Sequence, residues 1–232
     1  MKIHIFYSHY NVTKTDNKSR PQWFDYEKCF INLLNTIKDK DVELHLVMDG
    51  KVEDNWISKY KDKYITHEIK GGSMELVTKA IYSLILETKV DENDLIYVLE
   101  NDYLHVDGWV DKIVNLFENF KGLNYISLYD HYDKYFLPTY DDLVSKIFVT
   151  DTCHWRTVLS TCGSYITTKK IMDEDGEEHM GKNVPVGDHH KWLYLSESKN
   201  RFIITPLPGL STHCMEGLMS PTINWEVIND KN

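Results

Sequence analysis

The feature of this sequence that most constrains its fold is the alternation of short apolar runs with stretches of helical periodicity. The apolar runs cover residues 3–7, 42–48, 64–69, 95–99 and 125–129. Between them, apolar residues recur every three or four positions over residues 30–37, 74–85 and 109–120, which is the spacing of one helix face. Strands that alternate with helices predict an α/β fold with a mostly parallel central sheet and helices on both faces.

The length and composition predict a folded chain with one core. At 232 residues, it can bury roughly seven-tenths of the surface of its extended form. The 42% of hydrophobic and 27% of charged residues exclude intrinsic disorder. No low-complexity linker interrupts the sequence, so we expect a single domain over residues 1–232. Its second half is less regular, with strands expected over 161–167 and 201–205, a solvated acidic loop over 173–178 and a helix over 188–196.

The charge and the cysteines exclude several classes of protein. A formal net charge of −10, without a cluster of Lys and Arg, argues against nucleic acid as a partner. The four cysteines form no CxxC pair, so we expect reduced, mostly buried thiols rather than a zinc ribbon or a disulfide framework. They are Cys29, Cys153, Cys162 and Cys214.

The hydropathy pattern predicts no transmembrane segment. No run reaches the ~18 apolar residues of a membrane span, and the apolar run at residues 3–7 is too short for a signal peptide. We therefore expect a cytoplasmic protein, and peripheral contact with a membrane stays open.

Polar residues follow the expected strands, at the edge of the sheet where ligands of open α/β sheets bind. Neither GxGxxG nor GxxxxGK[ST] is present, which disfavours dinucleotide oxidoreductases and P-loop enzymes. The sharpest feature is Glu100-Asn101-Asp102, which directly follows the apolar run 95–99. In an extended chain Glu100 and Asp102 point the same way, about 7 Å apart, and suit one hard divalent cation. The alternative is that Asn and Asp only form a turn.

The order of these segments resembles a family 2-type glycosyltransferase of the GT-A fold, over residues 1 to about 130. The resemblance rests on Tyr7 with Ser8-His9-Tyr10-Asn11, Val47-Met48-Asp49-Gly50, Gly71-Gly72, Glu100-Asn101-Asp102 and Asp107-Gly108-Trp109. It implies a Rossmann-like three-layer sandwich in a single domain. Residues 1–130 would form the nucleotide-sugar-binding half and residues 131–232 the acceptor-binding half.

The resemblance also implies roles for individual residues. The family's metal-binding DxD motif matches Glu100-Asn101-Asp102, with Glu100 in place of the first acid, and a late histidine, His213, would complete the site for Mn²⁺ or Mg²⁺. The donor-binding residues would be Tyr7, His9, Asn11, Asp49, Gly72 and Asn101. Apart from the resemblance, Arg20 in the polar segment after residues 3–7 could close over the donor phosphates, and a solvated loop arginine is the alternative.

Residues in the second half would bind the acceptor and remove its proton. Asp188, at the start of the helix expected over 188–196, matches the family's catalytic base, although Gly187 stands where the family has an acid; the alternative is an N-cap. Trp155, Tyr165 and Trp192 are candidates to stack on an acceptor sugar, and core packing is the alternative for each.

These observations predict a metal-dependent glycosyltransferase. It would move a sugar from a nucleotide-sugar donor, with a UDP-sugar favoured, to the hydroxyl of a glycan or lipid-linked acceptor by one inverting displacement. Two other classes stay open: a nucleotidyl- or phosphoryl-transfer enzyme, and a non-catalytic carbohydrate-binding module suggested by the 21 Tyr and Trp residues. The donor sugar, the nucleotide base, the acceptor, the stereochemical outcome and the oligomeric state also stay open.

Overall fold

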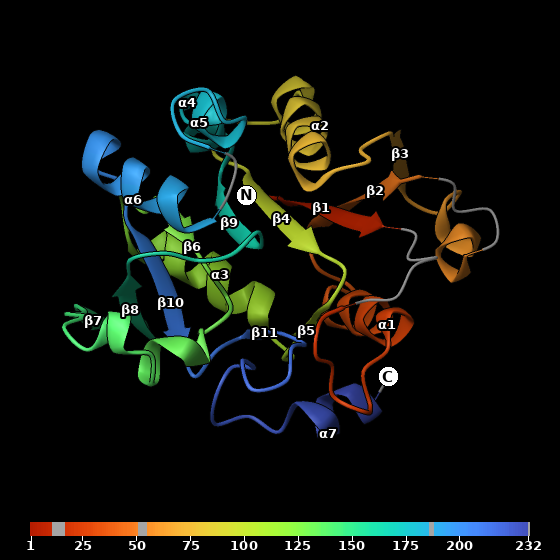
Figure 1. Ribbon diagram of the computed structural model, residues 1–232. Coiled ribbons are helices and arrows are strands. Elements are labelled where there is room, and N and C mark those ends of the chain that lie inside the picture. Colours follow the sequence, from red (N-terminus) through yellow and green to blue (C-terminus); the bar gives the residue numbers. More distant parts are fainter. Residues whose placement is uncertain (11–16, 51–54, 186–187, 232) are drawn as a thin grey trace. The chain divides into compact units, whose positions relative to one another are not determined.

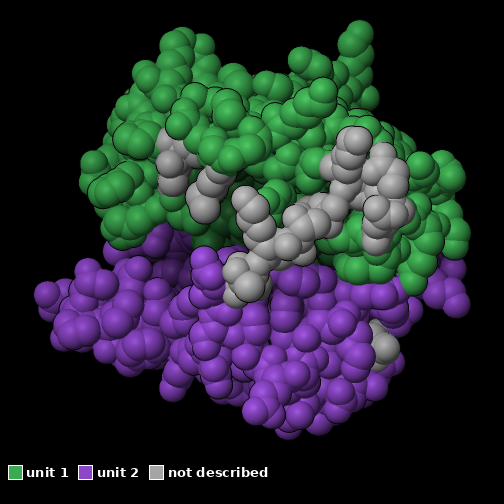
Figure 2. Space-filling model, turned by 45° about the vertical axis from the view of Figure 1, so that its right-hand side comes forward, with its two compact units in different colours: residues 1–16, 41–101, 162–201 green, residues 17–40, 102–161, 202–232 purple. Residues whose placement is uncertain are grey.

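A computed structural model describes residues 1–10, 17–50, 55–185 and 188–231 (Figure 1). The chain divides into two compact units, and each unit consists of three separate segments (Figure 2). Unit 1 comprises Met1–Asp16, Asp41–Asn101 and Cys162–Arg201. Unit 2 comprises Asn17–Lys40, Asp102–Thr161 and Phe202–Asn232. The expected division at residue 130 into a donor half and an acceptor half stays a prediction.

Unit 1 contains five strands in the order β3-β2-β1-β4-β9. Their bounds are β1 (Ile3–Tyr10), β2 (Val42–Asp49), β3 (Ile65–Ile69), β4 (Leu95–Glu100) and β9 (Tyr165–Thr168). The pairings of β1 with β2, β1 with β4, and β2 with β3 are parallel, and β9 runs antiparallel to β4. The central strand β1 is buried over most of its length, as expected for a strand covered on both faces. The α/β class with a mostly parallel sheet is therefore confirmed.

Three helical elements of unit 1, namely η1, α2 and α4, begin where a side chain accepts a hydrogen bond from a backbone N–H group of the first turn. Ser73 accepts a hydrogen bond from the backbone N–H of Leu76 and caps α2, as the sequence predicts. Helix α5 contacts α2, α4 and α6 (Figure 1). The helical elements are η1 (Trp56–Tyr60), α2 (Met74–Glu87), α4 (Lys169–Glu174), α5 (Gly176–His179) and α6 (Asp188–Lys199).

The acidic segment 173–178 is not the solvated loop that its composition suggests. It belongs to α4 and α5, and Asp175 and Glu178 are buried. Arg201 donates to Asp175, and Lys199 donates to both Asp175 and Glu178, at 2.7–3.2 Å. The two acids remain buried because these cations replace the water that the carboxylates lose on folding.

Unit 2 contains a four-stranded sheet in the order β6-β10-β8-β7 and a separate antiparallel pair, β5 and β11. The strands are β5 (Tyr103–His105), β6 (Tyr125–Ile126), β7 (Ile147–Val149), β8 (His154–Val158), β10 (Ile203–Leu207) and β11 (Ser211–His213). The helical elements are α1 (Tyr26–Thr36), α3 (Trp109–Asn119), η2 (Tyr132–Tyr135), η3 (Pro138–Tyr140) and α7 (Trp225–Asp230). An apolar cluster formed by Cys29, Leu104, Cys214 and Trp225 joins α1, α7, β5 and the end of β11. This cluster fixes the position of the β5–β11 pair.

The structure also bears on the expectations of reduced thiols and of no transmembrane segment. All four cysteines, which lie within the described residues, are free, and Cys162 is the one that is not buried. Among the described residues, no helix combines the length and the apolar surface needed to cross a bilayer.

We predict that His105 makes the fold sensitive to acid. Burial lowers the pKa of His105 to about 3, whereas an unfolded histidine titrates near ~6.5. Below pH 6.5 the unfolded state therefore binds more protons than the native state, so stability falls as the pH falls. From pH 7.5 to 5.5 this residue alone lowers the free energy of unfolding by roughly 1.3 kcal/mol. Urea denaturation at both pH values measures the free energy of unfolding. Between pH 7.5 and 5.5, this free energy should fall by roughly 1.3 kcal/mol less in His105→Gln than in the wild type. The exposed His190→Gln should lose as much as the wild type, and an equal loss in His105→Gln would contradict the prediction.

Candidate functional site

The polar residues that follow β1 and β4 meet in unit 1. The register places Ser8 of β1 opposite Glu100 of β4, so the carboxyl ends of both strands lie at one edge of the sheet. The Tyr7 hydroxyl donates to the backbone carbonyl of Asn101 at 3.4 Å, and the Asn101 amide nitrogen lies 3.2 Å from His9 Nδ1. The structure thus brings together three predicted donor-binding residues.

His9 is an uncharged member of this group at neutral pH. Burial lowers the pKa of His9 to about 4, although a hydrogen bond with Asn55 acts in the opposite direction. Its ring also contacts the edge of Trp56, with centroids 5.1 Å apart. A neutral imidazole here offers a hydrogen bond without attracting phosphate by charge.

Asp49 lies at the end of β2, opposite Tyr10 in the register, and is buried. Its Oδ1 accepts a hydrogen bond from the backbone N–H of Gly71 at 2.8 Å. A Cβ at Gly71 would come within 2.0 Å of Val77 and 2.8 Å of an Asp49 oxygen, so only glycine fits there. Gly72 is exposed and has a φ of 83°, a conformation that glycine adopts without strain. Asn11 lies outside the described residues.

Glu100 lies against the segment that precedes β9. A Cβ atom added at Gly163 would lie 3.1 Å from the Glu100 carboxyl group. Because glycine has no side chain, there is room for the Glu100 carboxylate. The backbone N–H of Glu100 donates to Ser164 Oγ at 3.0 Å. The metal-ligand role of Glu100 stays a prediction.

In unit 2, Asp102 and His213 are brought together by the pairing of β5 with β11. His213 is opposite Tyr103 in the register, and the backbone N–H of Cys214 donates to the Asp102 carbonyl. His213 Nε2 lies 2.9 Å from Asp102 Oδ2, although 111 residues separate them in the chain. The His213 ring stacks on Tyr103 with centroids 5.2 Å apart, which fixes its orientation.

Two cationic side chains share the same oxygen of Asp102. Arg20 donates to Asp102 Oδ2 at 2.7 Å and Lys18 donates to it at 2.9 Å. Lys18 Nζ also lies 3.3 Å from His213 Nε2, so the ammonium group contacts both the carboxylate and the imidazole. Burial by itself raises the pKa of Asp102, but the hydrogen bond from His213 and the charges of His213, Lys18 and Arg20 hold that pKa well below its ordinary value.

Arg20 is held more firmly than Lys18. Its guanidinium donates to the Cys214 carbonyl at 2.7 Å and to the Tyr26 hydroxyl at 3.2 Å, and it lies 4.5 Å from the centre of the Phe24 ring. The side chain of Arg20 is 11% exposed, whereas that of Lys18 is 43% exposed. Arg20 is thus a fixed part of the Asp102 group in this structure, and its predicted contact with a donor stays a prediction.

Asp102 and His213 have the donor atoms that a divalent cation needs. They supply a carboxylate oxygen and an imidazole nitrogen, and Asp102 Oδ1 is buried without a hydrogen bond to any described residue. Mg²⁺ and similar ions bind through one or two carboxylates and take their remaining ligands from water and substrate phosphates. The pair therefore fits a divalent cation, provided that Lys18 leaves the space between the two side chains.

The predicted base and acceptor residues have different surroundings. Asp188 is the first residue of α6 and is exposed. Tyr165 and Trp192 are buried in unit 1, edge to face with centroids 4.9 Å apart. Trp155 is buried in unit 2, where its indole N–H donates to Thr150. Burial of these three rings favours the core-packing alternative, and the role of Asp188 stays a prediction.

Lys18 is the site residue that the sequence reasoning missed. The signal was present, because Lys18 and Arg20 are two cations spaced two residues apart in a polar segment. Nothing in their spacing, however, indicates that both contact one acid 82 and 84 residues away.

We predict that Arg20→Lys destabilises the protein more than Lys18→Gln does. Lysine cannot reproduce three hydrogen bonds in different directions, and it would leave the Cys214 carbonyl and the Tyr26 hydroxyl without this donor. Losing such bonds at a buried site costs about 1–3 kcal/mol, whereas an exposed ion pair contributes about 0–1 kcal/mol. Chemical denaturation of both variants measures the difference, and equal losses would show that Arg20 is not the anchor of Asp102.

Comparisons with known proteins identify the fold. No model of a known protein family matches the sequence, and no curated protein sequence matches it. Residues 1–349 of TarS from S. aureus superpose with a TM-score of 0.52 at 12% identity, covering 88% of this chain and 58% of that chain. The chain thus spans little more than half of that structure.

Two further solved structures match this chain over most of both lengths. The 4-diphosphocytidyl-2C-methyl-D-erythritol synthase from Anaerococcus prevotii has a TM-score of 0.50 at 13% identity, covering 88% of this chain and 87% of that chain. CMP:2-keto-3-deoxy-manno-octonic acid synthetase complexed with CTP has a TM-score of 0.51 at 10% identity, covering 90% of this chain and 92% of that chain. These likenesses concern the fold, and they confirm the predicted GT-A-like, Rossmann-like architecture.

Proposed function

We propose that the protein is a metal-dependent glycosyltransferase that uses a nucleotide-sugar donor. The observation that carries the proposal is the Asp102 group of unit 2, in which one buried carboxylate contacts His213, Lys18 and Arg20. Breaking the bond between an anomeric carbon and a diphosphate leaves a growing negative charge, which fixed positive charge stabilises. The GT-A-like fold supports the same class of reaction.

Asp102 and His213 would hold the divalent cation, which supplies positive charge to the departing diphosphate. Lys18 is the side chain that gives way, because it is 43% exposed whereas Arg20 is 11% exposed. Its ammonium group is then available to pair with a phosphate of the donor. Arg20 stays on Asp102 Oδ2 and keeps the carboxylate ionised and oriented.

Asp188 would remove the proton of the attacking hydroxyl. It lies at the N-terminus of α6 and is exposed, so its carboxylate is accessible to an acceptor. One displacement with a general base inverts the configuration at the anomeric carbon. We propose a glycan or lipid-linked acceptor and favour a uridine nucleotide, as the resemblance of the sequence implies.

Donor binding should depend on both the metal and Asp102. In calorimetric titrations with UDP, GDP and CMP, we expect at least one nucleotide to bind the wild type at least ten-fold more tightly with Mn²⁺ than without it. Asp102→Asn removes the charge that attracts the cation and should abolish the difference. Asp111→Asn, an exposed acid of the same unit, is the matched control and should behave as the wild type. Negligible heat with all three nucleotides, with and without Mn²⁺, would contradict the proposal.

Turnover should depend on Asp188. Asp188→Asn is expected to lower the rate of sugar transfer by about 10²–10⁴-fold, the usual contribution of a general base, while nucleotide binding is unchanged. Glu197→Gln, an exposed acid on the same helix, is the control and should keep full activity. A screen of nucleotide sugars that follows released nucleoside diphosphate supplies the assay. Full activity of Asp188→Asn would exclude Asp188 as the base.

Nucleotidyl transfer is the second candidate. It is favoured by the two likenesses to synthases whose chains this one covers almost completely, one of them described in complex with CTP. Such an enzyme releases pyrophosphate from a nucleoside triphosphate, whereas a glycosyltransferase releases a nucleoside phosphate or diphosphate from a nucleotide sugar. Identifying the released product therefore separates the two reactions.

A further inference from the structure

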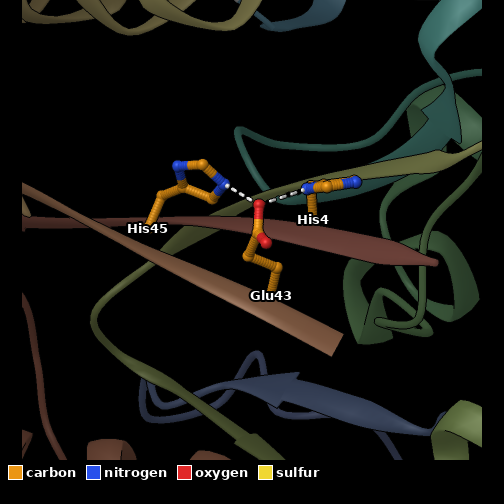
Figure 3. A group of neighbouring side chains, drawn as sticks. All are labelled: His4, Glu43 and His45. Carbon is orange, nitrogen blue, oxygen red and sulfur yellow. Dashed lines mark hydrogen bonds and ion pairs between the residues drawn. The ribbon is translucent and has the colours of Figure 1, made fainter. Parts of the chain in front are cut away.

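A second group of potential metal ligands lies in unit 1, on β1 and β2. Among the described residues, one set of three His, Cys, Asp or Glu side chains has ligand atoms within 4.8 Å of one another, namely His4, Glu43 and His45. His4 is opposite Glu43 in the register, and His45 follows Glu43 by two residues on the same strand. All three side chains therefore project from one face of the sheet, and both rings are directed at the Glu43 carboxylate (Figure 3).

Two of the three separations between the ligand atoms match those of a tetrahedral ion, and the third is within 4.8 Å. Glu43 Oε1 lies 3.1 Å from His4 Nδ1 and 3.3 Å from His45 Nε2. Two ligands of a tetrahedral zinc ion, each bonded at about 2.0–2.1 Å, are roughly 3.3 Å apart. His45 Nε2 is buried, and its contact with the Glu43 carboxylate is drawn in Figure 3. The three atoms could share one cation with little movement.

In each imidazole, the ring nitrogen that does not face Glu43 also has a polar partner. His4 Nε2 lies 3.4 Å from Asp94 Oδ2, and His45 Nδ1 lies 3.2 Å from His67 Nε2. Asp94 is fixed in turn, because the backbone N–H of Lys2 donates to its Oδ1 at 2.8 Å. Histidines that bind metals usually donate their other N–H to a carboxylate or another acceptor, which sets the tautomer and orients the ring.

Burial and charge fit the same assignment. Both imidazoles are 4% exposed, whereas the Glu43 side chain is 35% exposed and leaves a path from solvent. Lys2 Nζ is 3.7 Å from Glu43 Oε2, the oxygen that the histidines do not face. Glu43 and Asp94 bring two negative charges toward the ion, and Lys2 offsets one of them. Two imidazoles with one carboxylate favour zinc and neighbouring transition metals over Mg²⁺ or Ca²⁺, which prefer oxygen ligands.

We propose that His4, Glu43 and His45 form a binding site for a divalent transition-metal ion of the zinc class, with one position open to water. The site is independent of the proposed catalytic cation. Its ligands belong to unit 1, near the amino ends of β1 and β2, whereas Asp102 and His213 belong to unit 2. The ion would fasten β1 to β2, and His67 of β3 and Asp94 before β4 support its ligands.

The test is direct titration of the full chain with Zn²⁺ and with Co²⁺, after removal of metal by a chelator. We expect one equivalent to bind the wild type, the Co²⁺ form to show the intense visible absorption of a tetrahedral site, and Zn²⁺ to raise the Tm. Asp94→Asn should weaken binding by roughly 10–100-fold, as loss of an outer carboxylate partner does. Glu43→Gln removes a ligand and should weaken binding more than that.

Two control variants locate the bound ion. Glu68→Gln changes an exposed acid on β3 that points to the opposite face from His67, and it should bind Zn²⁺ as the wild type does. Asp102→Asn should also retain this ion, which separates it from the proposed catalytic cation. Near-ultraviolet circular dichroism checks that Glu43→Gln is folded. No binding to the wild type, or equal binding to Glu43→Gln and the wild type, would overturn the proposal.

Discussion

The parallel register of β1 between β2 and β4 is the constraint on which unit 1 depends. It places residues with the same position along each strand side by side, so Ser8 meets Glu100 and Tyr10 meets Asp49. A shift of one residue would turn every side chain of β1 to the other face and break both of these pairs. The same register places His4 opposite Glu43 at the other end of the strands. One pairing thus fixes both polar groups of the sheet.

In unit 2 the corresponding constraint is the buried charge of Asp102. A carboxylate that is 2% exposed loses most of its hydration, and the loss is offset only if cations and hydrogen-bond donors surround it. Arg20 serves this purpose, and its own position depends on Cys214 and Tyr26. The apolar cluster around Cys29, Leu104 and Trp225 fixes the strand pair that delivers His213. Packing and electrostatics therefore determine the geometry together.

Local periodicity was sufficient to predict the regular elements of the first half of the chain. The runs at residues 3–7, 42–48 and 95–99 correspond to β1, β2 and β4, and Ser73 caps α2 as expected. The second half was harder to predict because its strands are short: β6 covers two residues where five were expected, and β7, β8 and β11 have three to five residues each. Such strands are specified by long-range pairing, which a sequence window does not contain.

The sequence also brought Asp102 and His213 into one hypothesis, and the structure places them 2.9 Å apart. It did not reveal Lys18 as their partner, since that contact joins residues 84 positions apart in the chain. Nor did it identify His4, Glu43 and His45 as a group. Both β1 and β2 were interpreted as apolar strands, and the pairing of His4 with Glu43 depends on the register between strands 39 residues apart.

The partners of Asp102 have a consequence for the order of binding in the proposed reaction. A divalent cation that approaches Asp102 and His213 must compete with Lys18, which already neutralises part of the carboxylate charge, so the cation alone gains little. A nucleoside diphosphate changes this balance, because its phosphate oxygens are further metal ligands and also attract the displaced ammonium group. Each ligand then strengthens the binding of the other by the same factor, as linkage requires. In the proposed reaction, Lys18 would thereby make cation binding depend on the presence of the donor.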